Sequence, residues 1–270
     1  MGATINKNGL LAGKVAVVTG ASRGIGEAIA LRYAMEGARV VVSARTVDEG
    51  DNMLPGSINT TVAHINEAGG EAMAVQANLA QEDDRLRLIT ETEAAMGPVD
   101  ILVNNAAVTY YMNTTEVTEK RFRLMMDVQV WAPLQLAQQV LPGMVERSSG
   151  RILNISSHSA IHPDKTQPSH GGTVYGMCKA ALERFTTGLA QEYYPHNIGI
   201  NVISPGLVAT PGAVFHNLIT EQSKKHVTPV EHMAEACLRL VHGDAQELTG
   251  RIDYASSVMR EFDLTAAELI

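Results

Sequence analysis

Short apolar runs alternate with longer segments of helical periodicity along nearly the whole chain, and this alternation limits the fold more than any other feature. The predicted strands are residues 14–19, 39–43, 72–76, 99–103, 151–155, 199–203 and 251–254. Helical spacing fills the intervals, as at residues 27–36, 58–68, 119–140 and 180–194. Such alternation folds as a parallel sheet with helices on both faces. The sequence therefore predicts one α/β domain over residues 1–270, a doubly wound sheet of about seven strands with its core at about 14–254.

Polar or glycine-bearing clusters follow most of these predicted strands. They are residues 20–26, Ala44 with Arg45, Asn78, Asn104 with Asn105, Ser156 with Ser157, and Pro205 with Gly206. In doubly wound sheets, ligands bind outside the carboxyl ends of the strands. Because the clusters all fall at that same edge, the sequence predicts one ligand cleft there.

The first of these clusters is a glycine turn between a strand and a helix. Its predicted ligand contacts come from Gly20, Ser22, Arg23, and the Gly-Ile-Gly of residues 24–26, that is Gly24, Ile25 and Gly26. Glycines let backbone N–H groups and the positive end of a helix approach a phosphate. A tight strand–helix connection explains the same spacing without a ligand, so the turn alone leaves both readings open.

The end of the second strand bears on the choice of dinucleotide. A cofactor with a free ribose 2′-hydroxyl calls for a carboxylate at this position, whereas the chain has Ala44 followed by Arg45. Arginine pairs well with a 2′-phosphate. Arg23 in the glycine turn supplies a second cation, so we expect NADP(H) rather than NAD(H).

The two segments after the second and third strands have less specific signals. Residues 46–57 contain Pro55 and two glycines and are predicted to be a loop insertion. Asn78 is expected either to contact the adenine ring or to cap the helix that begins near Asp83. Leu79 beside it is included among the predicted cofactor contacts.

Tyr175 and Lys179 are separated by four residues near the start of a helical run. This spacing puts the phenol and the ammonium on one helix face. A nearby lysine cation favours the phenolate and would lower the pKa of the tyrosine from its ordinary value near ~10. Tyr175 is therefore a candidate general acid/base, although the same spacing also occurs in ordinary surface pairs.

Composition excludes several classes of partner. A net charge of −8 and a pI near 5.6 argue against a nucleic acid or an acidic membrane as the partner. Cys178 and Cys237, the two cysteines, form neither a disulfide framework nor a metal-ligand pattern. No apolar run approaches the ~20 residues that span a bilayer. We expect a cytoplasmic protein whose partners are small molecules or copies of itself.

Taken in order, the motifs resemble those of the short-chain dehydrogenase/reductase family over residues 14 to about 254. The matching motifs are Thr-Gly-Ala-Ser-Arg-Gly-Ile-Gly at 19–26, Asn-Asn-Ala at 104–106, the serine after Arg-Ile-Leu-Asn-Ile at 151–155, Tyr-x-x-x-Lys at 175–179 and Pro-Gly at 205–206. The order and the strand–helix context of all five motifs support the resemblance. It implies a Rossmann-type fold and hydride transfer between NADP(H) and the carbonyl or secondary alcohol of a fairly apolar small molecule.

The resemblance also implies a role for each matching residue. Tyr175 would transfer the hydroxyl proton, Lys179 would lower its pKa and bind the nicotinamide ribose, and Ser157, with Ser156 as the alternative, would hold the substrate oxygen. The implied catalytic set is Ser157, Tyr175, Lys179 and Gln129. The implied cofactor contacts further along the chain are Asn105, Ala106, Tyr175, Lys179, Pro205, Gly206 and Thr210. Members of the family are commonly dimers or tetramers joined through two long helices.

The chain departs from the family pattern in three places. The glycine that usually follows Asn-Asn-Ala is Ala107, and the asparagine of the catalytic set is replaced by Gln129. The segment between Ser157 and Tyr175 is long and contains His158, His162 and His170. Prolines in this segment break regular helical spacing and no carboxylate or thiol pattern accompanies the histidines, so no metal is expected and they are predicted to line or cover the substrate pocket.

Other functions fit parts of the pattern. An NAD-dependent alcohol dehydrogenase of the same family and a non-catalytic NADP-sensing protein on the same fold both remain alternatives, because fold does not fix function. A nucleotide-dependent methyltransferase also uses a glycine turn after its first strand. It would need an acid where Ala44 stands and has no use for the tyrosine–lysine pair.

Overall fold

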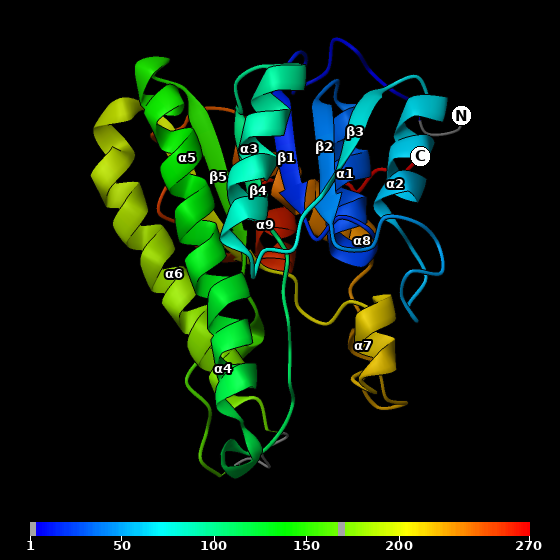
Figure 1. Cartoon of the computed structure of the whole chain (residues 1–270), viewed down its shortest axis with the longest axis vertical. Helices are drawn as coiled ribbons and strands as arrows, with labels where there is room; N and C mark the ends of the chain where they lie inside the picture. Colours follow the sequence, from blue (N-terminus) through cyan, green and yellow to red (C-terminus); the bar gives the residue numbers. More distant parts are fainter. Residues whose placement is uncertain (1–3, 167–170) are drawn as a thin grey trace.

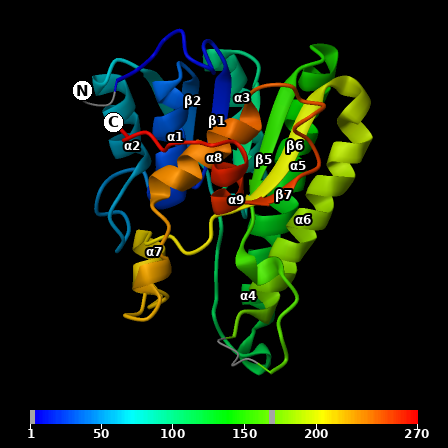
Figure 2. The ribbon, with the colours of Figure 1, turned by 180° about the vertical axis from the view of Figure 1, so that it is seen from behind.

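The computed structural model describes residues 4–166 and 171–270. In these ranges the strands form one parallel sheet in the order β3-β2-β1-β4-β5-β6-β7 (Figures 1 and 2). The strands are β1 Val15–Thr19, β2 Arg39–Ala44, β3 Glu71–Gln76, β4 Ile101–Asn104, β5 Gly150–Ile155, β6 Ile198–Ser204 and β7 Ile252–Tyr254. Each predicted strand is present, and the expectation of a doubly wound parallel sheet is confirmed.

Helices cover both faces of this sheet (Figures 1 and 2). One apolar core lies between the sheet and α1, α2, α8 and α9, and a second lies between the sheet and α3, α5 and α6. The helices are α1 Gly24–Met35, α2 Ile58–Glu67, α3 Glu82–Met96, α4 Glu119–Met126, α5 Ala132–Glu146, α6 Thr173–Tyr193, α7 Pro211–Phe215, α8 Val230–Val241 and α9 Ala255–Glu261. Short 3₁₀ turns occur at Thr114–Glu116, His158–Ala160, Tyr194–His196 and Lys224–His226. Within the part of the chain that the structure describes, no helix has the length and apolarity needed to cross a membrane.

The order of the strands reverses between β1 and β4, which are direct neighbours. The chain leaves β1 for α1 on one face of the sheet, whereas α5, which follows β4 and α4, packs on the other face. A crevice opens at such a switch point, outside the carboxyl ends of the two strands, and this is where doubly wound folds bind their ligands. The fold thus places the glycine turn after β1 beside the Asn-Asn-Ala segment after β4.

The helix predicted over residues 119–140 differs from the observed one in two ways. A π-helical turn, Asp127–Trp131, separates α4 from α5, and α5 continues through Pro142 to Glu146. Proline lacks the N–H that would bond back along the helix and usually ends or kinks it. Here Leu141 and Met144 are buried in the core beneath α5, so tertiary packing keeps the chain helical beyond Pro142.

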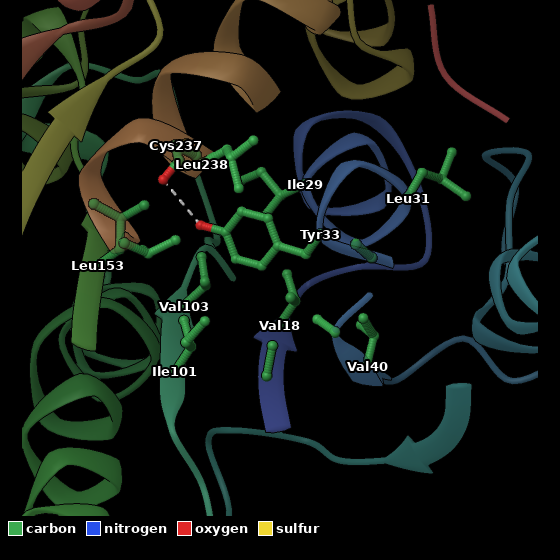
Figure 3. Close-up of a cluster of buried hydrophobic side chains, with 14 of the residues drawn as sticks. Val18, Ile29, Leu31, Tyr33, Val40, Ile101, Val103, Leu153, Cys237 and Leu238 are labelled. Atoms are coloured by element: carbon green, nitrogen blue, oxygen red, sulfur yellow. Dashed lines mark hydrogen bonds between the residues drawn. The ribbon is translucent and has the colours of Figure 1, made fainter. Parts of the chain in front are cut away.

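Tyr33 on α1 is the largest fully buried side chain of the core, and its phenol oxygen is therefore buried as well. Its hydroxyl donates to the backbone carbonyl of Cys237 on α8 at 3.1 Å (Figure 3). The ring lies among Val18, Ile29 and Val103, from β1, α1 and β4 (Figure 3). One residue therefore links two helices and the central strands on this face of the sheet.

Tyr33→Phe should lower the free energy of unfolding by about 1 kcal/mol, the usual worth of one buried hydrogen bond, because the ring still fills the same space. Tyr33→Ala should cost about 3–5 kcal/mol, because it leaves a cavity. Urea titrations of both variants measure the two values. Tyr194→Phe, at a side chain that is 47% exposed, is the matched control and should leave stability unchanged. Equal losses for the two Tyr33 variants would contradict this account.

Candidate active site

The helix that bears the candidate acid/base starts earlier than its apolar periodicity predicts. α6 begins at Thr173, after Gly172 in a left-handed conformation with φ of 87°, so Tyr175 lies in its first turn. Lys179 is on the same face, with its Nζ 5.7 Å from the centroid of the Tyr175 ring. The Lys179 ammonium donates to the carbonyl of Ile155, the last residue of β5, at 2.7 Å. This bond holds the pair over the carboxyl edge of the sheet.

Burial sets the protonation of both groups. Burial, with a smaller contribution from the Tyr111 phenol, raises the pKa of Tyr175 to about 12, although the Ser157 and Thr109 side chains beside the phenol act in the opposite direction. Burial lowers the pKa of Lys179 to about 8. The expectation that Lys179 brings the tyrosine's pKa below its ordinary value is therefore wrong for this arrangement, because the largest effect on the phenol is its loss of hydration on burial. At neutral pH the phenol keeps its proton.

The two adjacent serines after β5 have different partners. Ser156 is buried and its hydroxyl donates to Oε1 of Glu183, one turn beyond Lys179 on α6, at 2.6 Å. Ser157 is the serine whose side chain lowers the pKa of Tyr175, so it lies beside the phenol. Its Oγ also accepts from the backbone N–H of Ser159 at 3.2 Å. The geometry thus brings Ser157, not Ser156, to the phenol.

The glycine turn is packed against the segment after β4. Gly20 has φ of 66°, and a Cβ on it would lie 2.8 Å from the Cα of Ala106. A Cβ on Gly26 would lie 2.4 Å from the carbonyl oxygen of Gly20 and 2.5 Å from Nδ2 of Asn105. Larger residues are excluded at both positions. As a result α1 begins directly at the turn, and its N-terminal N–H groups face the carboxyl edge, where helix N-termini favour phosphate.

Gln129 lies in the π-helical turn between α4 and α5 and is 1% exposed. Its Nε2 donates to the carbonyl of Val108, in the segment after β4, at 2.9 Å. Its Oε1 is buried and has no hydrogen-bond partner among the described residues. π-helical turns are frequent at functional sites, and this one aims an amide into the loop that precedes Tyr111.

The predicted contacts at the adenosine end have distinct surroundings. Arg45 is exposed, and its side chain makes no hydrogen bond or ion pair with any described residue. The Arg23 guanidinium is occupied by backbone carbonyls of the insertion at residues 46–57. Asn78 accepts from the N–H of Ala80 at 3.3 Å, so it shapes the turn before α3 rather than capping that helix. The Leu79 side chain belongs to the core, which leaves only its backbone for a ligand.

The segment after β6 reaches back to the glycine turn. Gly206 has φ of 76°, and Thr210 follows as the N-cap of α7, accepting from the N–H of Ala213 at 3.1 Å. A Cβ on Gly24 would lie 3.1 Å from the methyl group of Thr210. The structure therefore brings Thr210 next to the glycine turn, with Pro205 and Gly206 at the end of β6.

Three residues near Tyr175 lack a sequence signal of their own. The Tyr111 ring lies 5.9 Å from that of Tyr175 and 6.1 Å from that of His216, and the Thr109 side chain is close enough to the phenol to lower its pKa. They come from irregular segments after β4 and β6, where no periodicity marks a buried position. Only the position of these segments at the carboxyl edge could have pointed to them.

Two of the histidines between Ser157 and Tyr175 lie in the described residues, and their surroundings differ. The His158 ring is 5.6 Å from that of Tyr254 at the end of β7, and His162 is exposed. His170 lies outside the described residues. No group of three or more His, Cys, Asp or Glu side chains is placed to hold a metal in the ranges 4–166 and 171–270.

Two surface hollows lie away from this site. One of about 450 Å³ lies between the start of α3 and α4 and is lined by Gln81, Lys120 and Asp127 among others. Another of about 230 Å³ lies at the amino ends of the strands, beside Lys14 and Arg151. Neither includes Tyr175 or Lys179, so we locate the site from the convergence of these side chains at the switch point and not from the shape of the surface.

The strand order, the glycine turn and the buried Tyr175–Lys179 pair define a Rossmann-type oxidoreductase. The family model described as short chain dehydrogenase matches residues 14–218. The chain therefore belongs to the short-chain dehydrogenase family, which confirms the resemblance seen in its motifs.

Relatives cover most of the chain. An uncharacterized oxidoreductase of Methylorubrum extorquens is 35% identical over 259 residues, which are 93% of this chain and 99% of that protein. The human dehydrogenase/reductase SDR family member 4 is 34% identical over 255 residues, 89% of this chain and 85% of its own. A crystal structure of a 3-oxoacyl (acyl-carrier-protein) reductase from Agrobacterium tumefaciens with NADP bound has a TM-score of 0.78 and 28% identity, and the alignment covers 91% of this chain and 93% of that one.

The buried cation of Lys179 should make stability depend on pH. Its pKa in the folded protein, about 8, lies below its ordinary 10.5, so its burial cost is complete below pH 8 and disappears as the pH rises toward 10.5. Lys179→Met removes this cost. The stability advantage of the variant should therefore shrink by roughly 2–3 kcal/mol between pH 7 and pH 10, since each pKa unit is worth about 1.4 kcal/mol.

Urea titrations of wild type and Lys179→Met at several pH values measure this change. Lys120→Met, at an exposed position of α4, is the control whose difference from wild type should stay constant. A constant difference for Lys179→Met as well would show that the ammonium is hydrated in the folded protein.

Proposed function

We propose that the chain is one dinucleotide-binding and catalytic domain that acts as an NADP(H)-dependent oxidoreductase on the carbonyl or secondary alcohol of a fairly apolar small molecule. The observation that carries the proposal is the contact of Ser157 and the Lys179-backed Tyr175 at the sheet edge where the glycine turn opens. When bound, the cofactor supplies or accepts the hydride. The chain's own residues bind, orient and exchange the proton.

At neutral pH the protonated phenol can serve as the acid in the reduction of a carbonyl. With a pKa of about 12, the Tyr175 phenol holds a proton that it can donate to a carbonyl oxygen as negative charge develops there. Ser157 lies beside the phenol and would orient that oxygen through a second hydrogen bond. Lys179 places a cation under the ring and stabilises the phenolate left behind.

The residues at the other end of the site fit a phosphorylated dinucleotide. The N-terminus of α1 and the glycine turn would hold the pyrophosphate, because N–H groups at a helix N-terminus favour a phosphate. The turn requires glycines because Ala106 and Asn105 approach it closely. Arg45 is an exposed cation at the end of β2, where a ribose 2′-phosphate would lie. The NADP-bound Agrobacterium relative supports the same assignment.

Exposed apolar side chains support an apolar substrate and self-association. Val214 and Phe215 are exposed on α7. The ring of His216, which directly follows α7, lies beside the Tyr111 ring, so α7 is near Tyr111. On the α4–α6 side, Trp131 and Met177 are exposed as well, as is typical of surfaces that bind a second copy. We propose a homodimer or homotetramer, located in the cytoplasm.

Tyr175→Phe should abolish turnover and leave NADPH affinity nearly unchanged, because the ring still packs but has no proton to transfer. The loss of a positioned acid is expected to lower kcat by ~10²-fold or more. NADPH oxidation in the presence of a panel of aldehydes and ketones measures turnover, and fluorescence titration measures NADPH binding. Turnover within a few-fold of wild type would refute the mechanism.

Gln129 is proposed to keep the place of the family's asparagine, with its buried Oε1 available to a water molecule that resupplies protons through Lys179. Gln129→Asn keeps the amide and should stay within a few-fold of wild type. Gln129→Ala should lower kcat by less than the ~10²-fold expected at Tyr175, because a relay is less direct than the acid. Matching kcat and pH profiles for wild type and Gln129→Ala, at equal folded stability, would assign Gln129 to packing alone.

A further inference from the structure

The insertion at residues 46–57, between β2 and α2, lies directly against the glycine turn. A Cβ on Gly56 would lie 2.4 Å from the carbonyl oxygen of Ser22, and its φ of 99° also favours glycine. Thr61 in the first turns of α2 donates to the carbonyl of Ala21 at 3.1 Å. The insertion and the helix that follows it are thus in contact with the segment that would hold a pyrophosphate.

Arg23 makes the polar connection between the two segments. Its Nε donates to the carbonyl of Pro55 at 2.7 Å, and its Nη2 donates to the carbonyl of Gly56 at 2.6 Å and to Oγ1 of Thr46 at 3.4 Å. A guanidinium has five N–H donors in a fixed fork, and paired donors of that fork are what a phosphate engages. In Arg23 one side of the fork is already used by backbone carbonyls.

An acidic side chain, Glu49, makes hydrogen bonds within the insertion and with the start of α2. Both carboxylate oxygens of Glu49 accept from the N–H of Gly56 at 3.1 Å, and Oε1 accepts from the hydroxyl of Thr60 at 3.0 Å. Glu49 is near enough to Arg23 to attract it electrostatically. Neither arginine forms an ion pair with a described residue, but the charge of Arg23 is attracted by Glu49 and repelled by Arg45, and its guanidinium bonds the insertion. The Arg45 side chain makes no hydrogen bond with a described residue.

We propose that Arg23 is a positioning residue that fastens the insertion onto the glycine turn, and that Arg45 alone recognises a 2′-phosphate. The fastened insertion then supports the turn in the same way for NADPH and NADH. This inference rests on the proposed function. It revises the sequence-based expectation that Arg23 assists Arg45 at the 2′-phosphate.

The two roles differ in how they affect the two cofactors. Arg23→Gln should weaken NADPH and NADH by the same factor, about tenfold, which is the value of one charge-assisted hydrogen bond. Arg45→Gln should weaken NADPH by about tenfold and leave NADH unchanged. Titration calorimetry or fluorescence with both nucleotides gives the four dissociation constants. A loss confined to NADPH in Arg23→Gln would overturn the proposal.

Two further variants separate charge from position. Arg23→Lys keeps the cation, but an ammonium cannot bond both carbonyls as the guanidinium fork does, so its nucleotide affinities should resemble those of Arg23→Gln. Retained NADPH affinity in Arg23→Lys would count against the proposal.

Gly56→Ala pushes the insertion away from Ser22 and should lower the affinities for NADPH and NADH equally. Gly50→Ala is its matched control, since Gly50 also has a positive φ, of 94°, but nothing lies within 4 Å of an added Cβ.

Hydrogen exchange tests the fastening without any nucleotide. Backbone amides of residues 46–57 should exchange about tenfold faster in Arg23→Gln than in wild type, and at the wild-type rate in Arg45→Gln. Unchanged exchange in Arg23→Gln would overturn the positioning role. If wild-type protein binds neither nucleotide, the proposed function fails, and the exchange measurement alone then decides whether Arg23 holds the insertion.

Discussion

The structure depends most on the hydrogen bonds that join the ends of β1 and β4. Oγ1 of Thr19 donates to the carbonyl of Val103 and accepts from the N–H groups of Asn105 and Ala106. The Asn105 amide in turn donates to the carbonyls of Thr19 and Gly20. These buried bonds satisfy backbone groups that the switch point would otherwise leave unpaired. They fix the shape of the glycine turn and, with it, the position at which α1 begins.

A second set of polar contacts sets the position of α6 relative to the sheet. Lys179 bonds the carbonyl of Ile155, Glu183 accepts from Ser156, and Thr186 accepts from Asn154. All three partners come from the last residues of β5 or directly after it. Buried polar networks that are satisfied in one arrangement only favour a unique packing. Tyr175 lies one turn before Lys179 on the same helix, so these contacts of α6 with the end of β5 also fix the position of its ring.

The strands and the main motifs could be predicted from the sequence because apolar periodicity and glycine spacing are local signals. Properties that arise from tertiary surroundings could not be. The spacing of Tyr175 and Lys179 suggested a lowered tyrosine pKa, but burial, which the spacing does not encode, moves it the other way. The hydrogen bonds between Arg23 and the insertion could not be predicted either, because the insertion has no periodicity. Gln129 was located correctly on the α4–α5 helical run, whereas the π-helical turn that contains it comes from packing.

The position of β1 between β2 and β4 has a consequence for how the chain reaches its fold. β1 can pair with β2 as soon as the first strand–helix–strand unit is made, but its other edge waits for β4, which is synthesised only after α2, β3 and α3. Parallel pairing between distant segments forms slowly because the intervening chain must be ordered first. During synthesis the apolar edge of β1 therefore stays open for a long interval, and unpaired edges of this kind associate with other chains. An inner strand of the finished sheet is thus open to misassembly for much of the time in which the sheet is being built.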